Sequence, residues 1–162
     1  MNKGCDIPDA GAEYCQSGDN RCPRLSSART RTQLFPLGFL VMIGIGVDAI
    51  EIERFRRSLE RTPTMRTRLF TAEELEYVAP KADPVPSLAA RFAAREAVMK
   101  ALGVGLGAFG FHDVWVTRAE SGAPSLNFVG AAAELARQAG VQRWHVSISH
   151  SELIAIAYVI AE

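Results

Sequence analysis

The chain has 162 residues, of which 48% are hydrophobic, and its 18 Lys and Arg residues balance its 18 Asp and Glu residues. This length and composition are typical of one soluble domain that is large enough to bury a core. The neutral balance excludes a general attraction to nucleic acid, although a basic patch on one face is compatible with it.

Residues 1–41 differ in composition from the rest of the chain. They contain all three cysteines, a stretch rich in Ser, Arg and Thr over 21–32, and no apolar periodicity that would sustain a helix or a strand. We expect a disordered extension over 1–41, present in the natural protein or produced by an early start-codon assignment, and one domain over 42–162. The cysteines lack CxxC spacing and a neighbouring His, which predicts reduced thiols in a cytoplasmic protein rather than a zinc site.

An apolar run over 34–47 follows basic residues and has about the length of a signal-peptide core. No small-residue cleavage site follows it, and it is too short to span a bilayer. We therefore expect neither secretion nor a membrane span.

A strand is predicted over 42–48 because branched side chains alternate with glycines. One face carries Ile43, Ile45 and Val47, and the other carries Gly44, Gly46 and Asp48. The glycines leave room for another element to approach the backbone closely. Asp48 ends this bare face, either as the N-cap of a helix over 50–61 or as a metal ligand.

The next elements are two helices separated by a proline-containing loop. Thr71 and the glutamates after it resemble a capping box that opens a short helix to about Ala79. Good helix formers then predict a central helix from Pro86 to Gly103, with Ser87 as its N-cap and Gly103 as the left-handed residue that ends it.

The central helix has an apolar stripe with charged residues beside it. The stripe consists of Leu88, Phe92, Met99 and Leu102. Glu96 lies inside or beside the stripe, and Lys100 lies one turn further on. These two residues are either an ordinary i,i+4 ion pair on a solvated face or a carboxylate and a cation aimed at a half-buried site.

The chain after the central helix alternates between strands and a helix. The glycine-rich loop up to Gly110 is either a flexible connector or an anion site beside Lys100 that is lined by backbone N–H groups. A hairpin, a helix and a strand then follow, at 113–118 with 124–128, at 131–139 and at 143–149. His150 ends a row of core residues on this strand, which is more typical of a structural histidine than of a ligand contact.

The last strand, over 153–161, is apolar on both faces. The larger side chains are those of Ile154, Ile156, Tyr158 and Ile160, and the smaller ones are those of Leu153, Ala155, Ala157 and Val159. Neither face suits water, so each must be covered. The second face is covered either by another subunit or by the chain's own helices.

Three blocks carry a family resemblance. Residues 43–48 read IGIGVD, followed by Glu51 and Arg54; residues 91–107 read RFAAREAVMKALGVGLG; residues 145–150 read HVSISH. In this order, and over 42–162, they resemble the signature of the holo-[acyl-carrier-protein] synthases, the small phosphopantetheinyl transferases.

The resemblance implies a fold and a reaction. The fold would be α+β, with a mostly antiparallel sheet packed on a long central helix, and the working unit would be a homotrimer with sites between neighbouring subunits. The reaction is attack by a serine hydroxyl of an acyl carrier protein on the phosphorus that bears the pantetheine arm of coenzyme A. It releases adenosine 3′,5′-bisphosphate and serves fatty acid or polyketide synthesis.

The same resemblance implies roles for single residues. Asp48 and Glu96 would hold one Mg²⁺, whose other ligands would be waters and the pyrophosphate of coenzyme A. Lys100 and the metal would stabilise charge that develops on the pyrophosphate oxygens. Either Glu96 or a metal-bound water would take the serine proton.

Substrate and partner contacts are implied in the same way. Arg54 and Arg91 would face the acidic carrier protein, whereas Ser149, His150 and Gly105 would lie near the nucleotide.

The chain departs from the family pattern at two positions. Arg95 stands where many members have Lys, so the charge is kept but the donor geometry changes. Ala123 stands where Lys is frequent. Both positions concern phosphate contacts rather than the reaction.

An alternative function is also open. The same chain could be a non-catalytic oligomer that binds carrier protein or nucleotide without transferring the arm.

Overall fold

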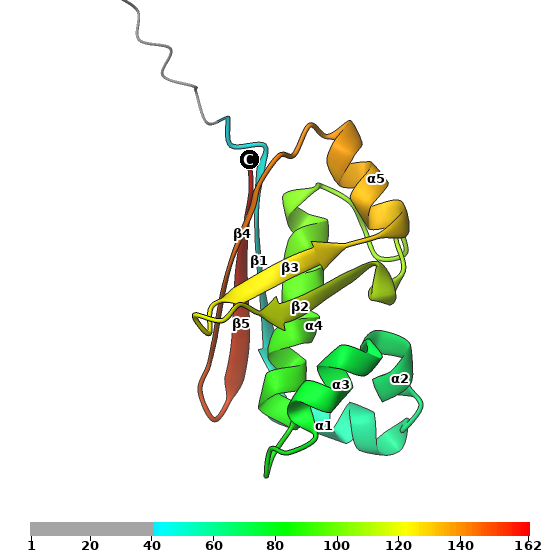
Figure 1. Cartoon of the computed structure of the whole chain (residues 1–162). Coiled ribbons are helices and arrows are strands. Elements are labelled where there is room, and N and C mark those ends of the chain that lie inside the picture. The colour runs from blue at the N-terminus through cyan, green and yellow to red at the C-terminus, as the bar shows by residue number, and fades with distance from the viewer. Residues whose placement is uncertain (1–40) are drawn as a thin grey trace, which may run out of the picture. The chain divides into compact units, whose positions relative to one another are not determined.

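The computed structural model describes residues 41–162, which form helices and strands around one central helix (Figure 1). The expectations for residues 1–40, including the three cysteines, lie outside the described residues. The elements are, in order, β1 (Gly44–Glu51), α1 (Ile52–Arg61), α2 (Met65–Leu69), α3 (Ala72–Val78), α4 (Val85–Ala101), the 3₁₀ turn η1 (Phe111–Asp113), β2 (Val114–Arg118), β3 (Pro124–Phe128), α5 (Gly130–Gln138), β4 (Trp144–His150) and β5 (Ile154–Ala161).

The strands form two antiparallel sheets. β5 is the central strand of a three-stranded sheet of order β1-β5-β4, and β2 and β3 form a separate hairpin. Helix α4 runs along the three-stranded sheet, and α1, α2 and α3 lie around one end of it (Figure 1). The expected α+β fold, with an antiparallel sheet on a long helix, is confirmed.

The glycine face of β1 is where α4 approaches the sheet. A Cβ atom added at Gly44 would lie 1.9 Å from the carbonyl oxygen of Ala101, and one added at Gly46 would lie 1.8 Å from that of Ala97. No side chain fits in either place, so the backbones of β1 and α4 are in direct contact. The predicted bare face is confirmed, and the element that uses it is the central helix.

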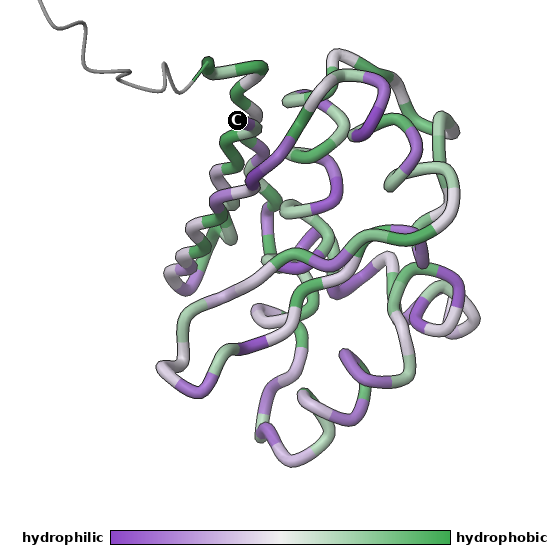
Figure 2. Tube along the Cα trace, turned by 45° about the horizontal axis from the view of Figure 1, so that its top comes forward, coloured by the Kyte–Doolittle hydropathy of each residue, from purple (hydrophilic) through white to green (hydrophobic). Residues whose placement is uncertain are grey.

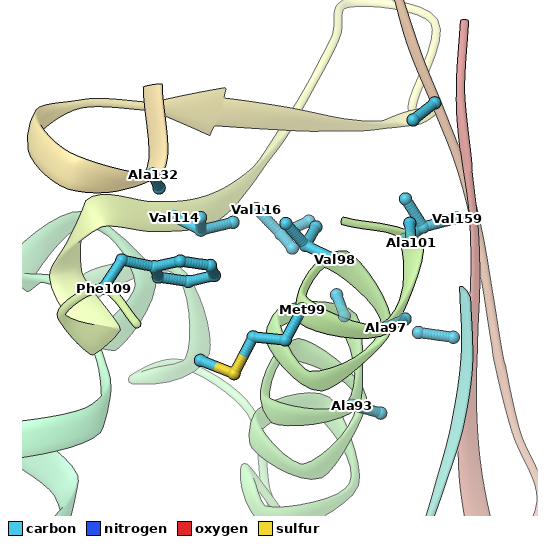
Figure 3. Packing of buried hydrophobic residues seen from close by; sticks show 13 residues of the cluster. Ala93, Ala97, Val98, Met99, Ala101, Phe109, Val114, Val116, Ala132 and Val159 are labelled. Carbon is cyan, nitrogen blue, oxygen red and sulfur yellow. The ribbon is translucent and has the colours of Figure 1, made fainter. Parts of the chain in front are cut away.

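Helix α4 is buried on nearly all of its sides, not along one stripe. Its middle is built of alanines and Val98, which pack on the sheet on one side and against Phe109 and Val114 on another (Figure 3). The predicted stripe does pack in the core, but burial extends well beyond it, because small alanines let several elements approach the helix at once. A second cluster joins the N-terminal half of α4 to α1, α2 and α3.

The start of α4 differs from the expectation. The helix begins at Val85, whose N–H donates to Asp83 Oδ1 at 3.0 Å, and Ser87 lies inside the first turn without a capping hydrogen bond. The predicted N-cap at Ser87 is wrong. Asp83 already accepts the N–H of the first helical residue, and the prolines near the helix start fix backbone angles that suit a helix.

The two faces of β5 have different surroundings. Its small face, made of Ala155, Ala157, Val159 and Ala161, is buried. On its large face, Ile156 and Tyr158 are 42% and 48% exposed, and Ile45 and Val47 of β1 are exposed beside them. Within residues 41–162, α4 therefore covers one face of this strand and the other face is left open.

The described part of the chain begins with hydrophobic residues, which are green in Figure 2. No helix among residues 41–162 is long and apolar enough to cross a membrane.

Candidate active site

Asp48 is placed by the alternation of β1. It follows Gly44 and Gly46 on the face that meets α4, and β1 continues to Glu51 before α1 starts at Ile52. The N-cap of α1 is thus Glu51. Of the two roles that the sequence left open for Asp48, the helix cap is excluded.

Glu96 and Lys100 reach the same place from α4. They lie one turn apart, next to the two residues whose carbonyl groups touch the β1 glycines. The ammonium group of Lys100 donates to Asp48 Oδ1 at 2.8 Å and to the carbonyl oxygen of Val47 at 2.9 Å. The close contact of β1 and α4 therefore brings two carboxylates and one cation together.

The two carboxylates of this site are only partly satisfied. Asp48 Oδ2 is buried and has no hydrogen-bond partner among the described residues. Burial raises the pKa of Glu96, the negative charge of Asp48 raises it further, and Lys100 partly opposes both effects. The site thus holds an orphaned oxygen beside a carboxyl group that resists ionisation.

These features fit a divalent cation with hard oxygen ligands. The part of the chain that the structure describes contains no cluster of three or more His, Cys, Asp and Glu residues. A protein cage for a metal is thus not formed here. Mg²⁺ does not require one, because it is commonly held by one or two carboxylates together with waters and substrate phosphates.

Arg91 is not placed as the sequence predicted. Its side chain is 8% exposed, its guanidinium lies 4.3 Å from the ring centre of Tyr77, and its Nε atom is 3.9 Å from Glu74 Oε1. Within one chain, Arg91 therefore stabilises the packing of α3 on α4 and offers little surface to a partner. Arg54 is exposed on α1.

Ser149 and His150 are not brought to Asp48 within the chain. They are exposed neighbours on β4, so their side chains point to opposite faces. β5 lies between β4 and β1, and its Ala157 is the partner of Asp48 whereas its Ala155 is the partner of His150. Gly105 lies exposed in the loop after α4.

A buried ion pair between α3 and α4 was missed by the sequence reasoning. Arg95 is fully buried, pairs with the carboxylate of Glu74, and donates to the carbonyl oxygens of Phe111 at 2.7 Å and Arg91 at 3.0 Å. Arg95 therefore contacts protein groups on all sides. The sequence did place Glu74 in a capping box with Thr71, and this prediction is confirmed. The capping pattern does not reveal that Glu74 also pairs with Arg95.

Comparison with known proteins agrees with this geometry. A family model described as the 4′-phosphopantetheinyl transferase superfamily matches residues 44–159. The holo-[acyl-carrier-protein] synthase of Streptomyces avermitilis is 49% identical over 122 residues, which cover 75% of this chain and 98% of that protein. The chain belongs to the holo-[acyl-carrier-protein] synthase family of transferases.

Solved structures of family members share the fold. The synthase of Neisseria meningitidis superposes with a TM-score of 0.70 at 32% identity, covering 75% of this chain and 99% of that one. The synthase of Helicobacter pylori in complex with coenzyme A gives a TM-score of 0.63 at 28% identity, covering 73% and 99%.

Proposed function

We propose that this chain transfers the 4′-phosphopantetheine arm of coenzyme A to a serine of an apo acyl carrier protein, with Asp48, Glu96 and Lys100 as its catalytic residues. The observation that carries the assignment of these residues is the buried, unpartnered Oδ2 atom of Asp48 beside Glu96 and Lys100. Transfer of this arm is the reaction of the family to which the chain belongs.

Asp48 and Glu96 are the proposed ligands of one Mg²⁺. When bound, the ion would neutralise charge on the pyrophosphate of coenzyme A and so favour the departure of adenosine 3′,5′-bisphosphate. Asp48 contributes an oxygen that has no other partner, and Glu96 contributes a carboxyl group whose charged form gains from a nearby cation.

Glu96 is also the proposed general base. The serine oxygen forms a bond to phosphorus, the phosphorus–oxygen bond to adenosine 3′,5′-bisphosphate breaks, and the serine proton passes to Glu96. Glu96 suits this role by its place beside Asp48 and Lys100, where the reacting phosphate of coenzyme A is proposed to lie. Lys100 stabilises the charge on the leaving group.

Coenzyme A is the proposed donor, as the complex of the Helicobacter pylori relative supports. Ser149, His150 and Gly105 are proposed to contact its nucleotide. Ser149 and His150 are separated from Asp48 by β5 within one chain, so we place them in the site of a neighbouring subunit.

A homotrimer is the proposed working unit. The open apolar face of the three-stranded sheet supports an oligomer, since an exposed patch of this kind is a common mark of an interface. The face is lined by Ile45, Val47, Ile154, Ile156 and Tyr158.

The acyl carrier protein is proposed to dock on α1. This helix carries the exposed residues Arg54, Arg57 and Arg61, which suit an acidic partner. Arg54 keeps the partner-binding role inferred from the sequence, whereas the burial of Arg91 removes the support for the same role there. Residues 42–162 are proposed as the transferase domain, and the match over 44–159 lies inside it.

The test is a mass measurement on apo acyl carrier protein incubated with the chain, coenzyme A and Mg²⁺. The expected result is a gain of one phosphopantetheine group, which disappears with Asp48→Ala or Glu96→Ala. Binding of carrier protein without any change in mass would instead favour a non-catalytic module.

A further inference from the structure

Lys100 already places a positive charge on the carboxylate of Asp48, the proposed metal ligand. Its ammonium group lies 2.8 Å from Asp48 Oδ1 and 2.9 Å from the carbonyl oxygen of Val47. Both are hard oxygen atoms on β1, the ligand type that Mg²⁺ prefers. The chain therefore supplies its own cation to the carboxylate that is the proposed ligand.

The arrangement leaves Asp48 half satisfied. The second carboxylate oxygen is buried without a partner, and Glu96 adds a second acidic group nearby. A dication bound to Asp48 Oδ2 and to Glu96 would lie at the same carboxylate as the ammonium group of Lys100, which is bound to Oδ1. Two cations at one carboxylate repel each other, so binding of the ion weakens the hold of Asp48 on the lysine.

The lysine can move at little cost. Its side chain is 52% exposed, in contrast to 14% for Asp48, and it carries its charge on a flexible four-carbon stem. The lysine is the exposed partner of this pair, so its ammonium group can exchange Asp48 for another anion without leaving solvent.

We propose that Lys100 and the divalent ion compete for Asp48, so that metal binding releases the Lys100 ammonium group from β1 and makes it available to the phosphates of coenzyme A. This inference rests on the proposed metal site. It adds a linkage between the two ligands. Binding of the ion to Asp48 releases the lysine, which can then bind a substrate phosphate. Binding of a substrate phosphate to the lysine likewise releases Asp48, which can then bind the ion. Binding of the two is then mutually favourable, and by equal factors.

The experiment is a calorimetric Mg²⁺ titration of the full chain without coenzyme A, comparing the wild type with Lys100→Met. The variant is expected to bind Mg²⁺ about three- to tenfold more tightly, because it no longer loses an ion pair or repels the dication. The matched control is Lys81→Met, which removes an equal charge from an exposed lysine that lies over Tyr77 before the other end of α4. It is expected to bind Mg²⁺ like the wild type.

The same titration with saturating coenzyme A completes the cycle. Coenzyme A is expected to increase Mg²⁺ affinity more in the wild type than in Lys100→Met, because only the wild type can transfer its lysine to a phosphate. Melting temperatures in a metal chelator report whether both variants fold.

The outcomes separate the inference from the proposed function. Mg²⁺ affinity that is equal or weaker in Lys100→Met, with binding retained in both proteins, would overturn the competition and leave the two-carboxylate site standing. Mg²⁺ binding that is absent from every protein, with and without coenzyme A, would overturn both.

Discussion

The carboxyl group of Glu96 has a raised pKa because it is half-buried and because Asp48 lies beside it, while Lys100 offsets part of the effect. Between the ordinary and the raised pKa, the folded chain binds more protons at Glu96 than the unfolded chain does. The contribution of this residue to the free energy of unfolding is therefore present at low pH and lost as the pH rises through that window. The proposed catalytic residue is thus one whose neutral form the fold favours.

Glu96→Gln tests both aspects of this residue. The variant should lose transfer activity, because the amide is neither a base nor a charged metal ligand. It should also lose the part of the pH dependence of stability that Glu96 contributes. Because the amide carries no charge, the variant should melt at or above the wild-type temperature at neutral pH without metal. Melting curves against pH and the carrier-protein mass assay give the two readouts. Turnover at the wild-type rate with Mg²⁺ would exclude Glu96 as base and ligand.

Glu74 is the residue on which the packing around α4 depends. Its carboxylate pairs with the fully buried Arg95, accepts the N–H of Val116 at 3.1 Å and accepts the N–H of Thr71 at 3.1 Å. One buried side chain thus joins α3, α4 and β2. Removing one partner of such a pair leaves an uncompensated charge in the core.

Glu74→Ala should therefore lower the free energy of unfolding by about 3–5 kcal/mol. The neighbouring Glu76→Ala is the matched control, since Glu76 is exposed, and it should change stability by no more than about 0.5 kcal/mol. Urea denaturation measures both. Equal stability of the two variants would show that the pair contributes no more than a surface charge does.

At the scale of elements, sequence patterns that depend on neighbours along the chain predicted most of the fold. The alternation in β1, the capping box at Thr71 and the hairpin of β2 and β3 all rest on local rules. The start of α4 at Val85 and its all-round burial were not predictable, because they depend on Asp83 and on elements distant in sequence. The partners of Arg91 and Arg95 were missed for the same reason.

The candidate site was predictable to a similar degree. Periodicity placed Asp48 at the end of the glycine face of β1 and Glu96 inside or beside the apolar stripe of α4, and only the family resemblance paired the two. The contact of Lys100 with Asp48 requires the close approach of the two backbones, which only the folded chain shows. The positions of Ser149 and His150 depend on the strand order, which the sequence left open.

Helix α1 is the element that offers a charged surface to a partner. Arg54 is exposed there, and charge reversal in Arg54→Glu should slow association with the acidic carrier protein and flatten the salt dependence of that rate. Affinity for coenzyme A should stay within about twofold, because rim charges mainly affect association with the partner. Stopped-flow association at several salt concentrations is the measurement.

Arg137→Glu, an equal charge reversal on the exposed surface of α5, is the control and should leave the association rate unchanged. Loss of coenzyme A binding with normal carrier-protein association in Arg54→Glu would mean that Arg54 contacts the nucleotide instead.

At the scale of the whole molecule, the exposed apolar sheet face of residues 41–162 is the basis of the proposed oligomer. Tyr158 is 48% exposed, whereas its neighbour Ala157 points the other way and is fully buried. Tyr158→Glu should therefore dissociate the proposed trimer into folded subunits, and Ala157→Glu should unfold the chain, because it buries a charge in the core. Sedimentation and circular dichroism distinguish the two results. A wild-type chain that sediments as an active monomer would contradict the oligomer.

The sharing of sites between subunits is tested by mixing inactive variants. Asp48 and Glu96 meet within one chain, so a mixture of Asp48→Ala and Glu96→Ala subunits should stay inactive, because no site in it holds both intact carboxylates. A mixture of Asp48→Ala with His150→Ala should recover activity, up to about a quarter of the wild-type value for random assembly of a cyclic oligomer. In those recovered sites, one chain supplies the carboxylates and its neighbour supplies His150. If the second mixture is no more active than its components, His150 acts within its own chain or not at all. In that case His150 does not contribute to the site of a neighbouring subunit.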